Sequence, residues 1–169
     1  MICPLAGAVA AAQALPAAVI SPLALSRIAA MAAMTPDCAT GHILELRPAE
    51  IAGRVDLSHA YLAGPHGIGR LADLATGVAA LAPLWPFLDA CAALRLPLIW
   101  LEHDLDGAMA PPSLFFAPPA AEVAPAVRAA LALLPVRPAQ IDAVAATVAR
   151  LAPGARLRQV GVMVPRVPC

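Results

Sequence analysis

The first regular pattern along the chain is a strict alternation of side chains in residues 54–62. Every second residue from Val55 to Tyr61 is apolar or aromatic, whereas the residues between them are small or polar. This period of two is typical of a strand with one buried face. A shorter strand is predicted for His42 to Leu46, and Pro48 to Gly53 between the two segments has the composition of a turn.

Apolar residues recur at helical spacing in four later segments, residues 68–81, 86–95, 123–134 and 141–151. Pro83 ends the first of these helices, and Pro153 with Gly154 ends the last.

Two further segments are predicted to be strands. Leu96 to Leu101 is too short for a typical helix and is apolar on both faces, which is typical of a central strand. Leu157 to Val164 is a second apolar strand. Residues 107–119 are predicted to form a proline-rich loop, in which Leu114 to Phe116 either anchor the loop on the core or present a surface to a partner.

From residue 54 onward the predicted order is strand, helix, helix, strand, helix, helix, strand. Two antiparallel helices return the chain to the opposite end of the sheet, so the strands that they join run antiparallel. We therefore predict an α+β fold with two layers, in which a mainly antiparallel or mixed sheet carries paired helices on one face. If Pro83 and Pro135 only kink single long helices, the alternative is an α/β fold with parallel central strands.

The start of the chain differs in composition from the rest. Residues 1–26 carry no charge, but prolines interrupt them and no basic residue precedes them. These features argue against a secretory signal and against a membrane-spanning segment. We expect residues 1–36 to be an Ala-rich leader, either disordered or included through a mis-assigned start codon. Residues 37–169 then form a single α+β domain, which we expect to be truncated because the chain ends five residues after the apolar run V-G-V-M-V.

Composition excludes several classes of function. Of the 169 residues 61 % are hydrophobic, and the 11 basic residues, all of them Arg, balance 11 acidic residues. A chain without Lys has no Schiff-base lysine and no Walker A lysine, and a formal charge of zero argues against nucleic-acid binding. Ala, Pro, Gly and Arg have GC-rich codons, so we expect a GC-rich bacterial genome.

Cysteine usage predicts a reducing compartment. The four cysteines form no C-x-x-C pair, and the chain has no secretion signal, so we expect reduced thiols and a cytoplasmic protein. Cys91 falls on an apolar helical stripe and is predicted to be a core thiol.

The strongest candidate site is the acidic exit of the 96–101 strand. At a period of two, Trp100, Glu102, Asp104 and Asp106 point the same way, and the three carboxylates suit Mg²⁺ or Mn²⁺. Asp104-Leu105-Asp106 after an apolar strand resembles the D-x-D motif of GT-A glycosyltransferases, which implies a manganese and nucleotide-sugar site. The alternative is that Asp104 and Asp106 cap a turn. His103 is predicted to lie on the opposite face as a core histidine.

A second candidate is the glycine-rich turn before the first predicted helix. Backbone amides at a helix N-terminus bind anions, and a guanidinium adds a fork of donors. Gly64, Gly67, Gly69 and Arg70 are therefore predicted to bind a phosphate or carboxylate, the alternative being a plain turn and helix start.

A third possibility is a zinc site. Cys38, His42, His59 and His66 are all potential ligands, but their spacing matches no standard finger or ribbon. The alternative is that these residues are unrelated to one another.

Two functional hypotheses remain. One is a structural or protein-interaction domain, or a fragment of a larger protein, that buries its excess apolar surface against a protein partner or a second copy. The alternative is a metal-dependent enzyme or binding domain for a phosphorylated small molecule, which uses the acidic strand end.

Overall fold

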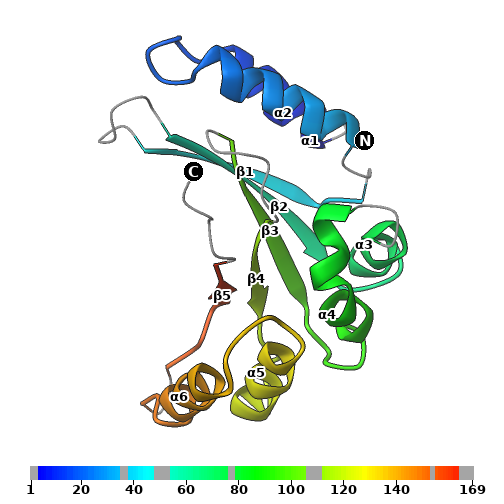
Figure 1. Cartoon of the computed structure of the whole chain (residues 1–169), viewed down its shortest axis with the longest axis vertical. Helices are drawn as coiled ribbons and strands as arrows, with labels where there is room; N and C mark the ends of the chain where they lie inside the picture. The colour runs from blue at the N-terminus through cyan, green and yellow to red at the C-terminus, as the bar shows by residue number, and fades with distance from the viewer. Residues whose placement is uncertain are drawn as a thin grey trace.

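The structure is a computed structural model that describes residues 4–34, 38–47, 54–75, 79–105, 112–152 and 155–163. Its elements in chain order are α1 (Pro4–Gln13), α2 (Pro22–Met34), β1 (Gly41–Arg47), β2 (Arg54–Leu62), α3 (Ile68–Ala75), the 3-10 helix η1 (Ala79–Leu84), α4 (Trp85–Ala90), β3 (Leu98–Asp104), β4 (Ser113–Ala117), α5 (Val123–Ala132), α6 (Pro138–Ala149) and β5 (Val160–Val162). Figure 1 shows α1 and α2 side by side at one end of the molecule, and α5 and α6 at the other.

The five strands form one sheet in the order β1-β2-β3-β4-β5, and each strand is antiparallel to its neighbours. The prediction of an α+β fold with an antiparallel sheet is therefore confirmed. The alternative with parallel central strands is wrong. Between β2 and β3 the chain forms α3, η1 and α4 rather than one long crossover helix, so β3 pairs with β2 in the antiparallel direction.

The proline-rich segment at 107–119 contains a strand that the sequence did not predict. Ser113–Ala117 forms β4 and pairs with β3 through the register Ile99↔Phe116 and Trp100↔Phe115. Proline cannot donate to a strand ladder, but Pro112 and Pro118 lie just outside β4, where no ladder hydrogen bond is needed.

Further boundaries differ from the predictions; for example, the helix predicted over 86–95 forms α4, which ends at Ala90. The helix predicted over 68–81 ends at Ala75, and Pro83 lies inside the separate helix η1. A short 3-10 helix forms few internal hydrogen bonds, so it tolerates a proline that lacks an N–H. The last strand covers only Val160–Val162 of the predicted 157–164, and residue 164 lies outside the described residues.

The N-terminal helices begin at residues suited to that position. Pro4 and Pro22 are the first residues of α1 and α2, where a missing N–H costs nothing. The side chain of Ser21 accepts a hydrogen bond from the amide of Ala24 at 3.0 Å, which caps α2. No helix in the described part of the chain is long and apolar enough to cross a membrane.

Two hydrophobic clusters join the helices to the sheet. The larger cluster packs Phe87 of α4 and Val127 of α5 against strand residues such as Tyr61 and Phe116, and the Phe87 and Phe116 ring centroids are 5.6 Å apart. In the smaller cluster, α1 and α2 pack against Val55 and Leu57 of β2 and against Leu105, which directly follows β3. The guanidinium of Arg27 on α2 also donates to the carbonyl of Leu105.

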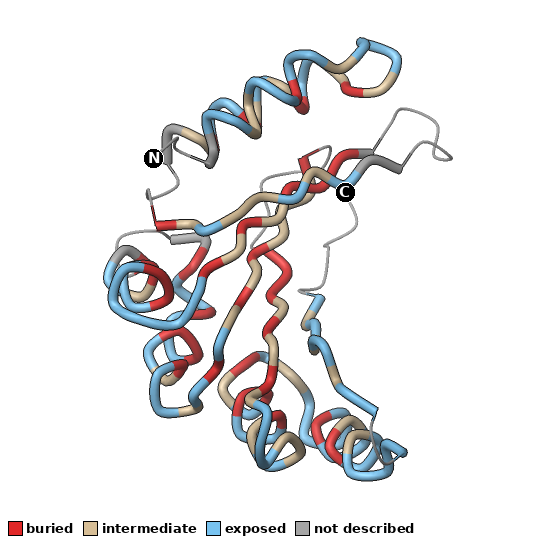
Figure 2. Tube along the Cα trace, turned by 180° about the vertical axis from the view of Figure 1, so that it is seen from behind, coloured by how far each residue is buried: buried red, intermediate tan, exposed pale blue. Residues whose placement is uncertain are grey.

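The strand residues in both clusters share one face of the sheet, because they occupy alternate positions in register with one another. Figure 2 shows this as buried positions that alternate with less buried ones along the strands. In neither cluster does a described helix pack on the opposite side of the sheet. We call that side the helix-free face, although Asp56 and Ser113 on it are buried; it carries the candidate site described next.

Candidate functional site

The acidic residues predicted at the end of β3 lie on the helix-free face. Trp100, Glu102 and Asp104 occupy alternate positions of β3, so the structure brings them to one side of the sheet. Asp106, the third predicted metal ligand, lies outside the described residues. His103 lies on the other face, with the core residues of β3, as predicted.

Neighbouring strands add carboxylates that the sequence analysis missed. The register places Glu45, Asp56 and Asp104 in one row across β1, β2 and β3. Asp56 is 1 % exposed, and the Ser58 hydroxyl donates to Oε2 of Glu102 at 3.5 Å. Each of these four carboxylates makes a polar or electrostatic interaction. Asp56 occupies a polar position in the alternating pattern of β2, and β2 pairs with a strand that ends in carboxylates. This combination is the sequence signal that could have identified Asp56.

The metal site stays a prediction. Among the residues that the structure describes, no three His, Cys, Asp or Glu side chains are arranged to hold a metal ion. Glu102 and Asp104 are two of the three predicted ligands, and the position of the third decides whether Mg²⁺ or Mn²⁺ can bind there.

A shallow hollow of about 340 Å³ lies beside these carboxylates on the helix-free face. We call it the sheet depression; its lining combines apolar, aromatic and polar side chains, namely Ile43, Glu45, Ser58, Trp100, Glu102, Phe115, Gln159 and Met163. Ile43 is 56 % exposed and Met163 is 55 % exposed, although both are large and apolar. Exposed apolar groups gathered in a concave surface are typical of binding sites.

The aromatic floor of the sheet depression depends on a close approach between strands. Trp100 and Phe115 are direct cross-strand partners, and Phe115 is paired in turn with Gly161 of β5. A Cβ at Gly161 would lie 2.4 Å from Cε1 of Phe115, so glycine is what allows the Phe115 ring to lie against β5. Sequence analysis singled out Phe115 only as part of a loop, because it did not predict β4.

The glycine-rich turn connects β2 to α3 as predicted. The Gly64 carbonyl accepts the amides of Gly67 at 3.3 Å and Gly69 at 3.0 Å, so two of the amides proposed for an anion are already hydrogen-bonded. Gly64 has a φ of +112°, and Arg70 is exposed on α3. The anion site with Gly64, Gly67, Gly69 and Arg70 stays a prediction.

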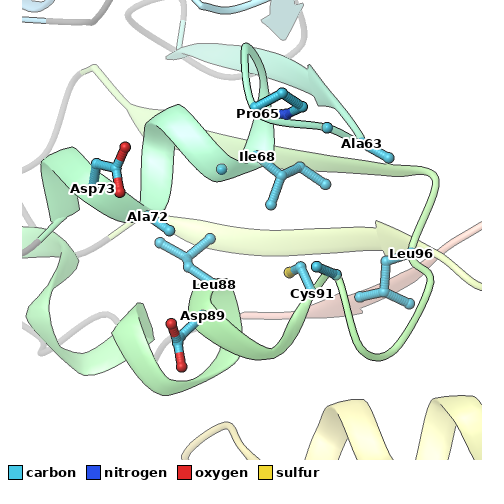
Figure 3. A pocket seen from close by; sticks show the side chains of 12 residues that line it. Ala63, Pro65, Ile68, Ala72, Asp73, Leu88, Asp89, Cys91 and Leu96 are labelled. Carbon is cyan, nitrogen blue, oxygen red and sulfur yellow. The ribbon is translucent and has the colours of Figure 1, made fainter.

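A pocket of about 360 Å³ opens between this turn, α3 and α4. We call it the helix pocket; Figure 3 shows Asp73 and Asp89 at one end of it and Leu96 at the other, with Leu88 and Cys91 between them. The prediction of a core thiol at Cys91 is confirmed, since the residue is 1 % exposed. Burial raises the pKa of the Cys91 thiol to about 12.

Three histidines gather on the helix-covered face, between the two hydrophobic clusters. The Nδ1 atoms of His42 and His59 are 2.7 Å apart, and the His59 and His103 ring centroids are 5.6 Å apart. The structure therefore joins two of the predicted zinc ligands, but Cys38 is buried in the larger cluster and His66 is exposed. Sequence spacing missed His103 as their neighbour because the contact depends on the register of β2 and β3.

The histidine cluster favours neutral rings. One Nδ1 must donate to the other, and the Nε2 atoms of His42 and His59 are buried with no hydrogen-bond partner among the described residues. Burial, with a smaller contribution from His103 and His42, lowers the pKa of His59 to about 3. Burial also lowers the pKa of His103 to about 4. The described carboxylates of β1, β2 and β3 lie on the other face of the sheet.

Comparison with known proteins gives no match to the chain among protein-family models, curated proteins or solved structures. Any function must therefore be argued from the residues themselves.

Proposed function

We propose that this protein is a non-catalytic interaction domain that binds a partner segment on the helix-free face. The observation that carries the proposal is the sheet depression, where exposed apolar side chains and carboxylates line one concave surface. The partner segment is extended, and it presents apolar side chains to Ile43, Trp100 and Phe115 and a guanidinium or ammonium group to Glu45 and Glu102.

Aromatic residues supply the apolar part of the contact. Trp100 and Phe115 lie side by side in the register, and large rigid side chains of this kind provide most of the binding energy in many interfaces. Ile43 and Met163 widen the apolar surface at its edge. A partner that covers these four side chains removes apolar area from water.

Charge supports a basic partner over a second copy of this chain. Glu45 and Glu102 line the sheet depression, and Asp104 lies on the same side of the sheet. Two copies joined depression to depression would bring these carboxylates of one copy near those of the other, which is unfavourable. A segment with Arg or Lys side chains meets the carboxylates with opposite charge.

A fluorescence titration tests the proposal. The chain has two tryptophans, and Trp85 is 42 % exposed at the start of α4, so Trp85→Phe leaves Trp100 as the only reporter. We expect a short peptide of alternating Leu and Arg to change Trp100 emission, whereas peptides of alternating Leu and Glu or Leu and Ser do not. Added salt should weaken the binding because the charges are solvent-accessible.

Matched charge variants localise the binding. Glu102→Gln removes a carboxylate from the sheet depression, and we expect it to weaken the Leu/Arg peptide several-fold. Asp142→Asn removes a charge from α6, outside the depression, and should leave the affinity unchanged. Equal weakening by both variants, or equal binding of the acidic peptide, would refute the proposal. A molar mass that doubles with concentration in light scattering would instead assign the face to a second copy.

A further inference from the structure

The helix pocket exists because small residues line its walls. Ala63 and Gly64 border it on one side, Gly69 and Ala72 face it from α3, and Ala92 faces it from the turn after α4. The absence of longer side chains at these positions leaves a volume of about 360 Å³, which is within the range of small-ligand sites. The pocket is separate from the sheet depression and shares no lining residue with it.

Its floor is apolar and chemically inert. Ile68, Leu88 and Leu96 supply hydrocarbon surface, and the Cys91 thiol donates to the carbonyl of Phe87 at 3.1 Å. The neutral thiol is neither a nucleophile nor a counter-ion. The floor therefore suits an alkyl group.

The described charged residues that line the pocket are both acidic. Asp73 comes from α3 and Asp89 from α4, and both lie at the same end of the pocket in Figure 3. Asp73 also lies in the last turn of α3, where the backbone carbonyls already give the helix end a partial negative charge. Asp73 makes an interaction within the protein, and a carboxylate has enough acceptor positions to take a cation as well.

The same arrangement disfavours the anion predicted from the sequence. Gly67 and Gly69 use their amides on the Gly64 carbonyl. An anion beside this turn would also lie near Asp73 and Asp89, which repel it.

We propose that the helix pocket binds a small organic cation with an apolar chain, of the primary alkylammonium class. The ammonium group lies between Asp73 and Asp89, and the chain runs over Leu88 and Cys91 toward Leu96. This assignment does not depend on the proposed interaction of the helix-free face.

Three ligands of equal chain length test the assignment in calorimetric titrations of the full chain. We expect hexylammonium to bind, and hexanoate and hexyl phosphate not to bind. Hexyl phosphate binding that is lost in Arg70→Gln would establish the anion site instead. Equal affinities for hexylammonium and hexanoate would show a purely apolar pocket. Either result would overturn the proposal, as would the absence of hexylammonium binding.

Two variants of the pocket sharpen the test. Asp89→Asn changes an exposed carboxylate without altering its size, and we expect it to weaken hexylammonium at least threefold. Asp142→Asn is the matched control and should have no effect. Ala92→Leu should abolish binding by filling the pocket. If Ala92→Leu lowers the thermal unfolding temperature, the test rests on Asp89→Asn alone. An unchanged affinity of Asp89→Asn for hexylammonium would refute the role of the carboxylates.

Discussion

Burial of His59 predicts that the fold loses stability as the pH falls from 7 to 5. The His59 side chain is 0 % exposed, and its pKa is lowered from 6.5 to about 3 in the folded protein. Above pH 6.5 the ring is neutral in both states and its titration has no effect. Below pH 6.5 the unfolded chain binds a proton that the folded chain does not, so stability falls until the pH approaches the folded pKa.

The magnitude follows from the two pKa values. At pH 5, proton uptake by the unfolded chain at His59 lowers the free energy of unfolding by about 2 kcal/mol. His103, whose pKa is lowered to about 4, adds a loss of similar size at pH 5. A loss of about 2–4 kcal/mol is a large part of the roughly 5–15 kcal/mol that holds a typical domain together.

Urea unfolding at pH 7 and pH 5 measures this loss. His59→Phe keeps an aromatic ring of similar size but cannot titrate, so we expect the stability difference between the two pH values to shrink by about 2 kcal/mol. Trp85→Phe changes an exposed aromatic residue that does not titrate and should leave the difference unchanged. If His59→Phe loses as much stability as the unmodified chain between pH 7 and pH 5, the argument from burial is wrong.

Two other predictions concern the β2–α3 turn and the acidic strand end. A Cβ at Gly67 would lie 2.1 Å from the Leu62 carbonyl oxygen, so Gly67→Ala should cost about 1–3 kcal/mol in urea unfolding; Gly41→Ala, whose Cβ meets nothing closer than 4.0 Å, should cost nothing. If the predicted metal site exists, Mg²⁺ or Mn²⁺ at 100 times its dissociation constant should add about 2.7 kcal/mol in thermal unfolding. Asp104→Asn/Asp106→Asn should remove that gain, and no gain in the unmodified chain would eliminate the site.

Local patterns were enough to predict several elements. The alternation from Val55 to Tyr61 predicted β2 with its observed bounds, because one face of this strand packs on the core and a shift by one residue would expose that face. The strand β4 was missed because its local sequence pattern is misleading. Its prolines are typical of a loop, and only pairing with β3 shows that they flank a strand rather than interrupt it.

The candidate site was predictable only within one strand. Trp100 and Glu102 lie two positions apart in β3, so strand periodicity alone places them on one side. Glu45 and Phe115 join them from β1 and β4, and that contact depends on register between segments far apart in the sequence. The His42–His59 contact has the same origin. The spacing of side chains in the sequence therefore predicts which residues of one strand share a face. Which residues of different strands meet in one site depends on how the strands pair.

The formal charge of zero conceals a separation of charge that a partner would meet. The sequence has as many acidic as basic residues, but the sheet register brings Glu45, Glu102 and Asp104 to the helix-free face, with Asp56 buried beside them. Two of the arginines are held elsewhere: Arg27 contacts the Leu105 carbonyl on the covered face, and Arg128 pairs with Asp142 between α5 and α6. A binding partner responds to the local potential of one face rather than to the sum over the chain. We therefore propose that the helix-free face suits a basic protein segment rather than a nucleic acid, because the carboxylates of the sheet depression repel phosphates.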